Sequence, residues 1–124
     1  MIRVLIVDDR PSVRWGLRMQ LMLEPDIEVI GEPAGGEETF SLVQQLQPDV
    51  VLMDVKMPGM DGLTATRGVQ AIRPMSAVVI LSLYDDTHLR AEAQAAGAAA
   101  FVSKHEEIDT LLTAIRQASR PGHE

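Results

Sequence analysis

The chain has 124 residues, a formal net charge of −7 and a hydrophobic content of 46%. These values fit one globular domain with a sizeable core, and they argue against a disordered chain and against nucleic acid binding through a Lys- and Arg-rich surface. The chain contains no Cys, which excludes disulfides, thiolate metal sites and cysteine nucleophiles.

Strand-like and helical patterns alternate from one end of the chain to the other. Short apolar, β-branched runs predict strands that are buried on both faces of a parallel sheet. Each run is followed by apolar residues at helical spacing, with Pro, Gly and acidic residues at the helix ends. We expect strands at 2–7, 27–30, 50–53, 78–81 and 99–102. The helices between them are expected from Pro11 to the break at Pro25, from Glu37 to the stop at Pro48, from an N-cap at Asp61 to about Arg73, and from Asp85-Asp86 to a residue before Gly97, with a last helix that carries apolar residues over 108–115.

Five strand–helix units in succession predict an α/β fold with a five-stranded, doubly wound parallel sheet and helices on both faces. We expect one domain over residues 1–120, with 121–124 as the start of a linker or tail. The longest apolar runs are strand-length, too short for a membrane span. A strand that begins at residue 2 leaves no room for a signal peptide, so we expect a cytoplasmic location.

Polar residues close four of the predicted strands. Asp8 and Asp9 follow the first strand, Asp54 the third, Ser82 the fourth and Lys104 the fifth. In an open α/β sheet, ligands bind beyond the carboxyl ends of the strands. Carboxylates on adjacent strand ends repel one another unless a hard cation lies between them, which predicts a Mg²⁺ (or Mn²⁺) site. An Asp carboxylate can also be a nucleophile that forms an aspartyl-phosphate, while Lys and Ser can contact phosphoryl oxygens.

Four motifs at these strand ends carry a resemblance to a known family. They are Val7-Asp8-Asp9, Leu52-Met53-Asp54-Val55-Lys56-Met57-Pro58-Gly59-Met60-Asp61-Gly62, Ile80-Leu81-Ser82 and Phe101-Val102-Ser103-Lys104. Over nearly its whole length the chain resembles the CheY-like receiver domain of a two-component response regulator. The stretches Pro58–Leu63 and Leu83–Asp86 most resemble the NarL/LuxR-type branch.

The resemblance implies a phospho-acceptor switch and not an enzyme that turns over a substrate. Asp54 would accept a phosphoryl group from a sensor histidine kinase. Asp9, Asp54 and the backbone carbonyl of Lys56 would ligate Mg²⁺, with Asp8 acting mainly through water. Lys104 would contact the phosphoryl group.

Two further roles follow from the resemblance, and one position departs from the family pattern. Ser82 would be the switch hydroxyl, and Phe101 the switch aromatic, which as Phe cannot donate a hydrogen bond. Most receivers have Pro after the lysine that closes the fifth strand, often with a cis peptide bond, whereas this chain has His105. The conformation of the Lys104–His105 bond is therefore open.

Other functions stay open at this point. A haloacid-dehalogenase-type phosphatase also forms an aspartyl-phosphate, but it needs a second acid where this chain has Lys56. A flavodoxin would need a neutral loop after the first strand, where residues 8–11 are acidic. NarL/LuxR-type relatives carry a C-terminal helix-turn-helix that binds DNA, and this chain has none. The chain is thus either part of a transcription factor or a stand-alone receiver.

The first predicted helix carries a second apolar stripe. Trp15, Met19 and Met22 fall together, opposite the face that carries Leu17 and Leu21. A helix beside a sheet has one face outward, so this stripe predicts a contact surface. By resemblance, some NarL/LuxR-type receivers dimerise through their first and last helices, and a homodimer is the implied partner.

Overall fold

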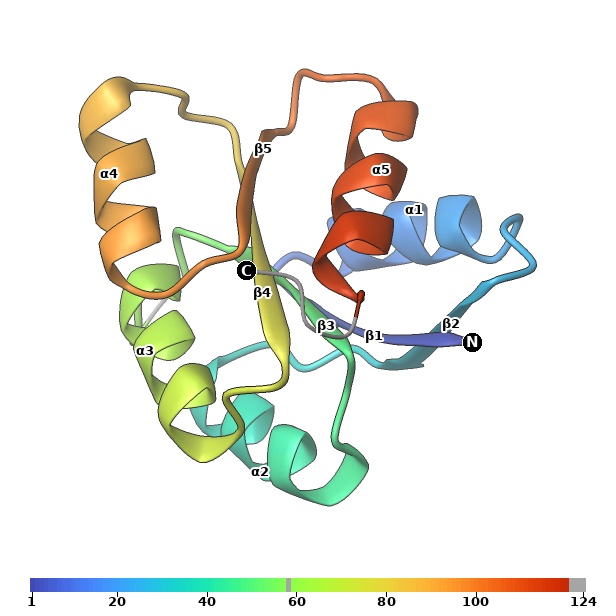
Figure 1. The fold of residues 1–124 in the computed structure, drawn as a ribbon, viewed down its shortest axis with the longest axis horizontal. Helices are drawn as coiled ribbons and strands as arrows, with labels where there is room; N and C mark the ends of the chain where they lie inside the picture. The colour runs from blue at the N-terminus through green and yellow to red at the C-terminus, as the bar shows by residue number, and fades with distance from the viewer. Residues whose placement is uncertain (58, 121–124) are drawn as a thin grey trace.

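The computed structural model describes residues 1–57 and 59–120, and its elements alternate as the sequence predicts. Pro58 and the predicted linker at 121–124 lie outside the described residues. The elements are β1 (Ile2–Val7), α1 (Pro11–Leu21), β2 (Ile27–Gly31), α2 (Gly36–Leu46), β3 (Val50–Asp54), α3 (Gly62–Ile72), β4 (Ala77–Ser82), α4 (Thr87–Ala95), β5 (Ala100–Ser103) and α5 (Ile108–Ala118). The predicted α/β fold is confirmed (Figure 1).

All five strands are parallel and lie in the order β2-β1-β3-β4-β5. The order reverses between β1 and β3, because β2 lies on one side of β1 and the later strands lie on the other. Val7 pairs with Met53 at this point, so the residues that follow β1 emerge beside Asp54. A reversal of this kind is where open α/β sheets bind ligands, at the carboxyl ends of the strands.

Helices cover both faces of the sheet and enclose two apolar cores. In Figure 1, α1 and α5 lie on one side of the strands, and α2, α3 and α4 lie on the other. Val4 and Ile6 of β1 pack in the core with α1 and α5, whereas Leu5 and Val7 pack in the core with α2, α3 and α4. Burial on both faces is why the strands read as continuous apolar runs and not as alternating ones.

Acidic residues cap two helices, and one helix starts later than predicted. The Asp61 carboxylate accepts a hydrogen bond from the Thr64 backbone N at 2.9 Å, which makes it the N-cap of α3. The fourth helix does not begin at Asp85. Asp86 is its N-cap, and the Asp86 carboxylate accepts a hydrogen bond from the Leu89 backbone N at 2.7 Å. An Asp is favoured at the N-cap, just before the first helical residue, because from there its side chain can accept from the free backbone N–H groups of the first turn.

The first turn of α3 lies against the end of β3. A Cβ placed on Gly62 would stand 2.0 Å from the Asp54 carbonyl oxygen, so no side chain fits there. The Gly62 backbone N donates to the Val55 carbonyl at 2.6 Å and closes the loop between them. The glycine therefore fixes where the chain turns after Asp54.

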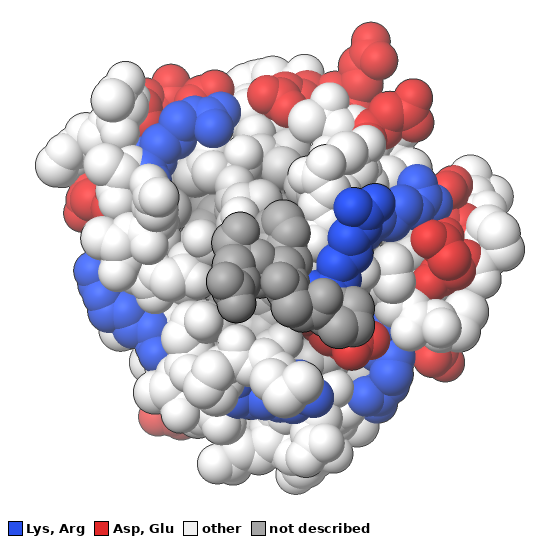
Figure 2. Space-filling view, viewed as in Figure 1, with Lys and Arg blue, Asp and Glu red and all other residues white. Residues whose placement is uncertain are grey.

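One face of the molecule carries charged side chains of both signs. In Figure 2, acidic and basic side chains are interspersed around the rim of the face shown. Among the described residues, no helix is both long and apolar enough to cross a membrane.

Candidate functional site

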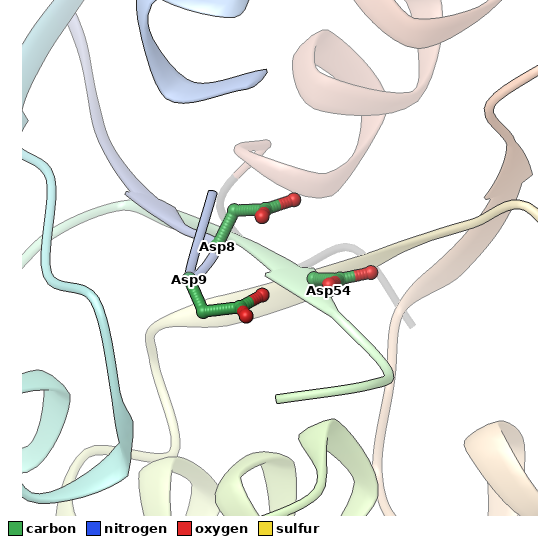
Figure 3. Close-up of side chains that lie close together, drawn as sticks. All are labelled: Asp8, Asp9 and Asp54. Atoms are coloured by element: carbon green, nitrogen blue, oxygen red, sulfur yellow. The ribbon is translucent and has the colours of Figure 1, made fainter. Parts of the chain in front are cut away.

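Three carboxylates meet at the carboxyl edge of the sheet. Asp8 and Asp9 extend from the end of β1 toward Asp54 at the end of β3 (Figure 3). One oxygen atom from each carboxylate lies within 4.8 Å of the other two. Asp8 and Asp54 are almost fully buried, with 2% and 7% of their surface exposed, and Asp9 is half-buried. Buried like charges this close need a counter-charge.

Lys104 supplies part of that counter-charge. Its Nζ lies 3.1 Å from Asp8 Oδ2 and 3.1 Å from Asp54 Oδ1, so one ammonium bridges the ends of β1 and β3. The Lys104 backbone N donates to the Ser82 carbonyl at 2.7 Å, which holds the end of β5 against the end of β4. The structure thus brings together four of the residues that the sequence placed at strand ends.

Two arginines that the sequence analysis did not single out hold Asp8 in place. The Arg10 backbone N donates to Asp8 Oδ1 at 2.9 Å, and its Nε lies 3.4 Å from the same oxygen. Arg14 donates a hydrogen bond to the Asp8 carbonyl. Arg10 and Arg14 are four residues apart at the start of α1, so they lie on the same side of the helix. Their position directly after Asp8 and Asp9 was the sequence signal that could have predicted these contacts.

Burial is the main influence on the acidity of Asp54. Desolvation raises the pKa of this carboxyl group, and the negative charge of Asp8 raises it further. The hydrogen bond and charge of Lys104 act in the opposite direction, but the pKa stays above its ordinary value. A cation bound beside Asp54 would therefore stabilise the charged form of its carboxylate, which burial and Asp8 disfavour.

A small cavity of about 220 Å³ opens beside Asp54. Its lining consists of Asp9, Arg10, Asp54, Val55, Lys56, Ser82, Leu83 and Tyr84. Ser82 Oγ accepts a hydrogen bond from the Tyr84 backbone N at 2.9 Å, and Lys56 Nζ lies 4.2 Å from the centre of the Tyr84 ring. The predicted switch hydroxyl therefore shares one cavity with the predicted phospho-acceptor.

The two remaining predictions concern Phe101 and the peptide bond after Lys104. Phe101 is half-buried on β5, with its ring 4.7 Å from Arg90 Cζ. The described residues contain no cis peptide bond, so the Lys104–His105 bond is trans.

The donor set fits a small hard cation. The ligand atoms that these three carboxylates offer are all oxygens. Mg²⁺ takes oxygen ligands, usually from one or two carboxylates together with other oxygens. The raised pKa of Asp54 points the same way, because a divalent cation would stabilise the charged carboxylate. The carbonyl of Lys56 stays a predicted ligand.

The fold and the site define a doubly wound α/β domain with an acidic, lysine-bridged pocket at the switch point of its sheet. Residues 4–116 match the model of the response regulator receiver domain, and the chain belongs to this family. It is 41% identical over 121 residues to the transcriptional regulatory protein LiaR of Bacillus subtilis, covering 97% of this chain and 57% of that protein. The chain spans little more than half the length of the curated relatives it matches.

Two solved structures show the same architecture. The signal receiver domain of a NarL response regulator from Mycobacterium tuberculosis is 30% identical, with a TM-score of 0.90 and 97% of each chain covered. The CheY in a CheX–CheY–BeF₃⁻–Mg²⁺ complex from Borrelia burgdorferi is 26% identical, with a TM-score of 0.84, covering 92% of this chain and 86% of that one. Family membership sets aside the flavodoxin and phosphatase alternatives.

Proposed function

We propose that the chain is a phospho-acceptor switch in a two-component pathway, with Asp54 as the acceptor. A carboxylate oxygen of Asp54 attacks the phosphorus of a phosphohistidine on a sensor histidine kinase. An O–P bond forms and the P–N bond breaks, and the electron pair stays on the imidazole nitrogen, which takes up a proton. The product is an aspartyl-phosphate.

The observation that carries this proposal is the position of Lys104. Its ammonium lies 3.1 Å from an oxygen of Asp54, on the carboxylate that would be phosphorylated. A lysine there provides a positive charge for phosphoryl oxygens, and positioning with electrostatics is most of what phosphoryl transfer requires. The hydroxyl of Ser82 borders the same cavity and can contact the new phosphoryl group.

Asp8, Asp9 and Asp54 would hold Mg²⁺, with the Lys56 carbonyl as a further ligand. The bound cation would offset negative charge on the carboxylates and on the incoming phosphoryl oxygens. The Borrelia burgdorferi CheY complex, which contains BeF₃⁻ and Mg²⁺, supports this assignment through the shared fold and family.

The output belongs to the same proposal. Relatives such as LiaR are transcriptional regulators of almost twice this length, so we propose that a C-terminal DNA-binding domain follows the receiver in the whole protein. This segment itself, with a net charge of −7, would not bind DNA, and it would act in the cytoplasm. A stand-alone receiver that acts through protein contacts is the alternative.

A homodimer through α1 is the proposed partner arrangement. Trp15 and Met22 are 60% and 63% exposed, as the stripe predicted. Met19 is partly buried, so it adds less apolar surface than expected. Leu23, just after the helix, is 80% exposed and extends the apolar surface. Aromatic and Met residues are favoured in interface cores.

Phosphorylation can be tested by intact mass measurement after treatment with acetyl phosphate and Mg²⁺. We expect the wild type to gain one phosphate, and Asp54→Asn or an excess of chelator to prevent the gain. Asp61→Asn is the matched control, because it changes an exposed Asp of the following loop and keeps a good N-cap. Equal labelling of Asp54→Asn and the wild type would refute the assignment of the acceptor.

A further inference from the structure

An arginine on α4 joins the predicted switch aromatic to the loop after β4. Arg90 Nε donates to Asp85 Oδ1 at 2.6 Å, and Arg90 Nη2 donates to Asp85 Oδ2 at 3.1 Å. The guanidinium carbon lies 4.7 Å from the centre of the Phe101 ring. One planar group therefore makes a two-point ion pair with the loop and stacks on the aromatic ring, a combination that lysine cannot reproduce.

The ring of Phe101 is bordered by open space on the side that faces α4. A cavity of about 250 Å³ lies beside it between α4 and β5. Its lining consists of four alanines together with three larger residues, namely Ala93, Ala98, Ala99, Ala100, Arg90, Gln94 and Phe101. A Phe ring cannot donate a hydrogen bond to fix its position, and the alanines leave room for it to move. The other face of Phe101 packs against the core with α2, α3 and α4, so on this side the contact with the ring is that of Arg90.

The same arginine is connected to Ser82 through a short loop. Ser82 Oγ accepts from the Tyr84 backbone N at 2.9 Å, and the next residue is Asp85. A movement of the hydroxyl toward Asp54 would displace this loop, and with it the carboxylate that orients Arg90. The ion pair and the ring stack thus belong to the conformation in which the Ser82 hydroxyl is bonded within its own loop.

We propose that Arg90 is a positioning residue that clamps Phe101 to Asp85 and so opposes the phosphorylated conformation. The proposal rests on the phospho-acceptor function of Asp54 and adds a regulatory element to it. A contact that is made in only one of two conformations favours that conformation by the free energy of the contact. A ligand that binds the other conformation then binds more weakly. Loss of the clamp should therefore tighten the binding of a phosphoryl mimic.

The test measures the affinity of the whole chain for beryllofluoride in saturating Mg²⁺, by ¹⁹F NMR titration. For Arg90→Ala we expect an affinity about 3- to 10-fold higher than that of the wild type. This ratio corresponds to the free energy of one exposed cation–π contact and one exposed ion pair. Arg90→Lys, which keeps the charge but loses the two-point pair, should lie between them. Arg67→Ala, a change of an exposed arginine on α3, should leave the affinity unchanged.

A second background separates positioning from a general loss of stability. In Phe101→Leu there is no ring to clamp and only the ion pair with Asp85 remains, so adding Arg90→Ala should raise the affinity by clearly less than it does in the wild type. Urea unfolding of each variant shows whether it is folded during the titration. If Arg90→Ala proves unfolded, Arg90→Gln, which keeps the aliphatic stem, is measured in its place with the same expectation.

The outcomes distinguish this proposal from the proposed function. An unchanged or weaker affinity in Arg90→Ala overturns the clamp, provided that the wild type binds beryllofluoride and Asp54→Asn does not. An equal gain in the Phe101→Leu background also overturns it. If the wild type itself fails to bind beryllofluoride with Mg²⁺, the phospho-acceptor function and the clamp both fail.

Discussion

At the scale of single residues, Asp54 occupies a position that disfavours its own charge. Burial and the neighbouring Asp8 raise the pKa of its carboxyl group, and Lys104 offsets this only in part. The same arrangement that costs stability would make the carboxylate responsive to a bound cation or to the proposed phosphorylation, because both change the charge balance at the site.

We expect Asp54→Asn to be more stable than the wild type at neutral pH without Mg²⁺. A raised folded-state pKa means that the folded chain binds more protons than the unfolded chain between the ordinary and the raised pKa. The wild type therefore loses stability as pH rises through that window, and each unit of pKa difference corresponds to about 1.4 kcal/mol. Urea unfolding should show an advantage for Asp54→Asn at pH 7 that disappears below the ordinary pKa of Asp.

Asp61 provides the control for this pH dependence, because its pKa is shifted in the opposite direction. The hydrogen bond from the Thr64 backbone N lowers the pKa of Asp61. Its contribution to stability is therefore present above the ordinary pKa and lost as pH falls. An Asp61→Asn variant that gained stability at pH 7 as Asp54→Asn does would contradict the assigned cause.

Lys104→Ala should separate metal binding from phosphoryl binding. The ammonium contacts Asp8 and Asp54 and competes with a cation for them, so its removal should leave Mg²⁺ affinity unchanged or higher. Beryllofluoride affinity should fall about 10- to 100-fold, because a charged hydrogen bond is lost. Calorimetric titration with Mg²⁺ gives the first value, and a large loss of Mg²⁺ affinity would show that the lysine is needed for the metal.

At the scale of elements, the contact between the end of β3 and the start of α3 controls the position of the site. Gly62 allows this contact, since a Cβ there would collide with the Asp54 carbonyl, which is backbone and cannot rotate away. The loop between β3 and α3 carries Lys56, the predicted carbonyl ligand. A shift of α3 would therefore reach the candidate metal site through the backbone.

Gly62→Ala should destabilise the protein by about 1–3 kcal/mol, the usual cost of forcing atoms into a packed region. Gly16→Ala is the matched control within α1, where a Cβ would meet nothing within 4 Å. It should stabilise the protein by about 0.5–1 kcal/mol, because Ala is favoured over Gly in a helix interior. Thermal unfolding measures both variants, and equal effects in the two would show that the collision at Gly62 is relieved.

At the scale of the whole molecule, the two faces of the sheet serve different parts of the proposed switch. The clamp of Arg90 on Phe101 lies on the side of α4, whereas the exposed apolar surface lies on α1 across the sheet. The proposed phosphorylation site at Asp54 lies between them at the sheet edge.

Trp15→Glu should abolish dimer formation if α1 is the interface. A charge in the centre of an apolar contact surface leaves an unpaired ion on association. Met75→Glu is the matched control, because Met75 is 81% exposed and lies far along the chain, before β4. Analytical ultracentrifugation with and without beryllofluoride gives the mass in solution. If the wild type and Trp15→Glu dimerise equally, the surface of α4, β5 and α5 becomes the better candidate.

The sequence by itself determined the order of the elements and the edge at which the site lies. Apolar runs with helical patterns between them are local signals, and the carboxyl ends of parallel strands must meet at one edge. Asp8, Asp9, Asp54, Ser82 and Lys104 could therefore be placed together before any distance was known. The N-cap at Asp61 was predictable for the same reason, because a cap depends on residues three positions apart.

Only the tertiary structure decided which side chains touch. Lys104 bridges Asp8 and Asp54, which stand 96 and 50 residues away along the chain, and no local pattern encodes such a distance. The stack of Arg90 on Phe101, the half-burial of Met19 and the trans bond after Lys104 were decided there too. Side-chain contacts depend on how helices pack against the sheet, and that packing is fixed by the whole core at once.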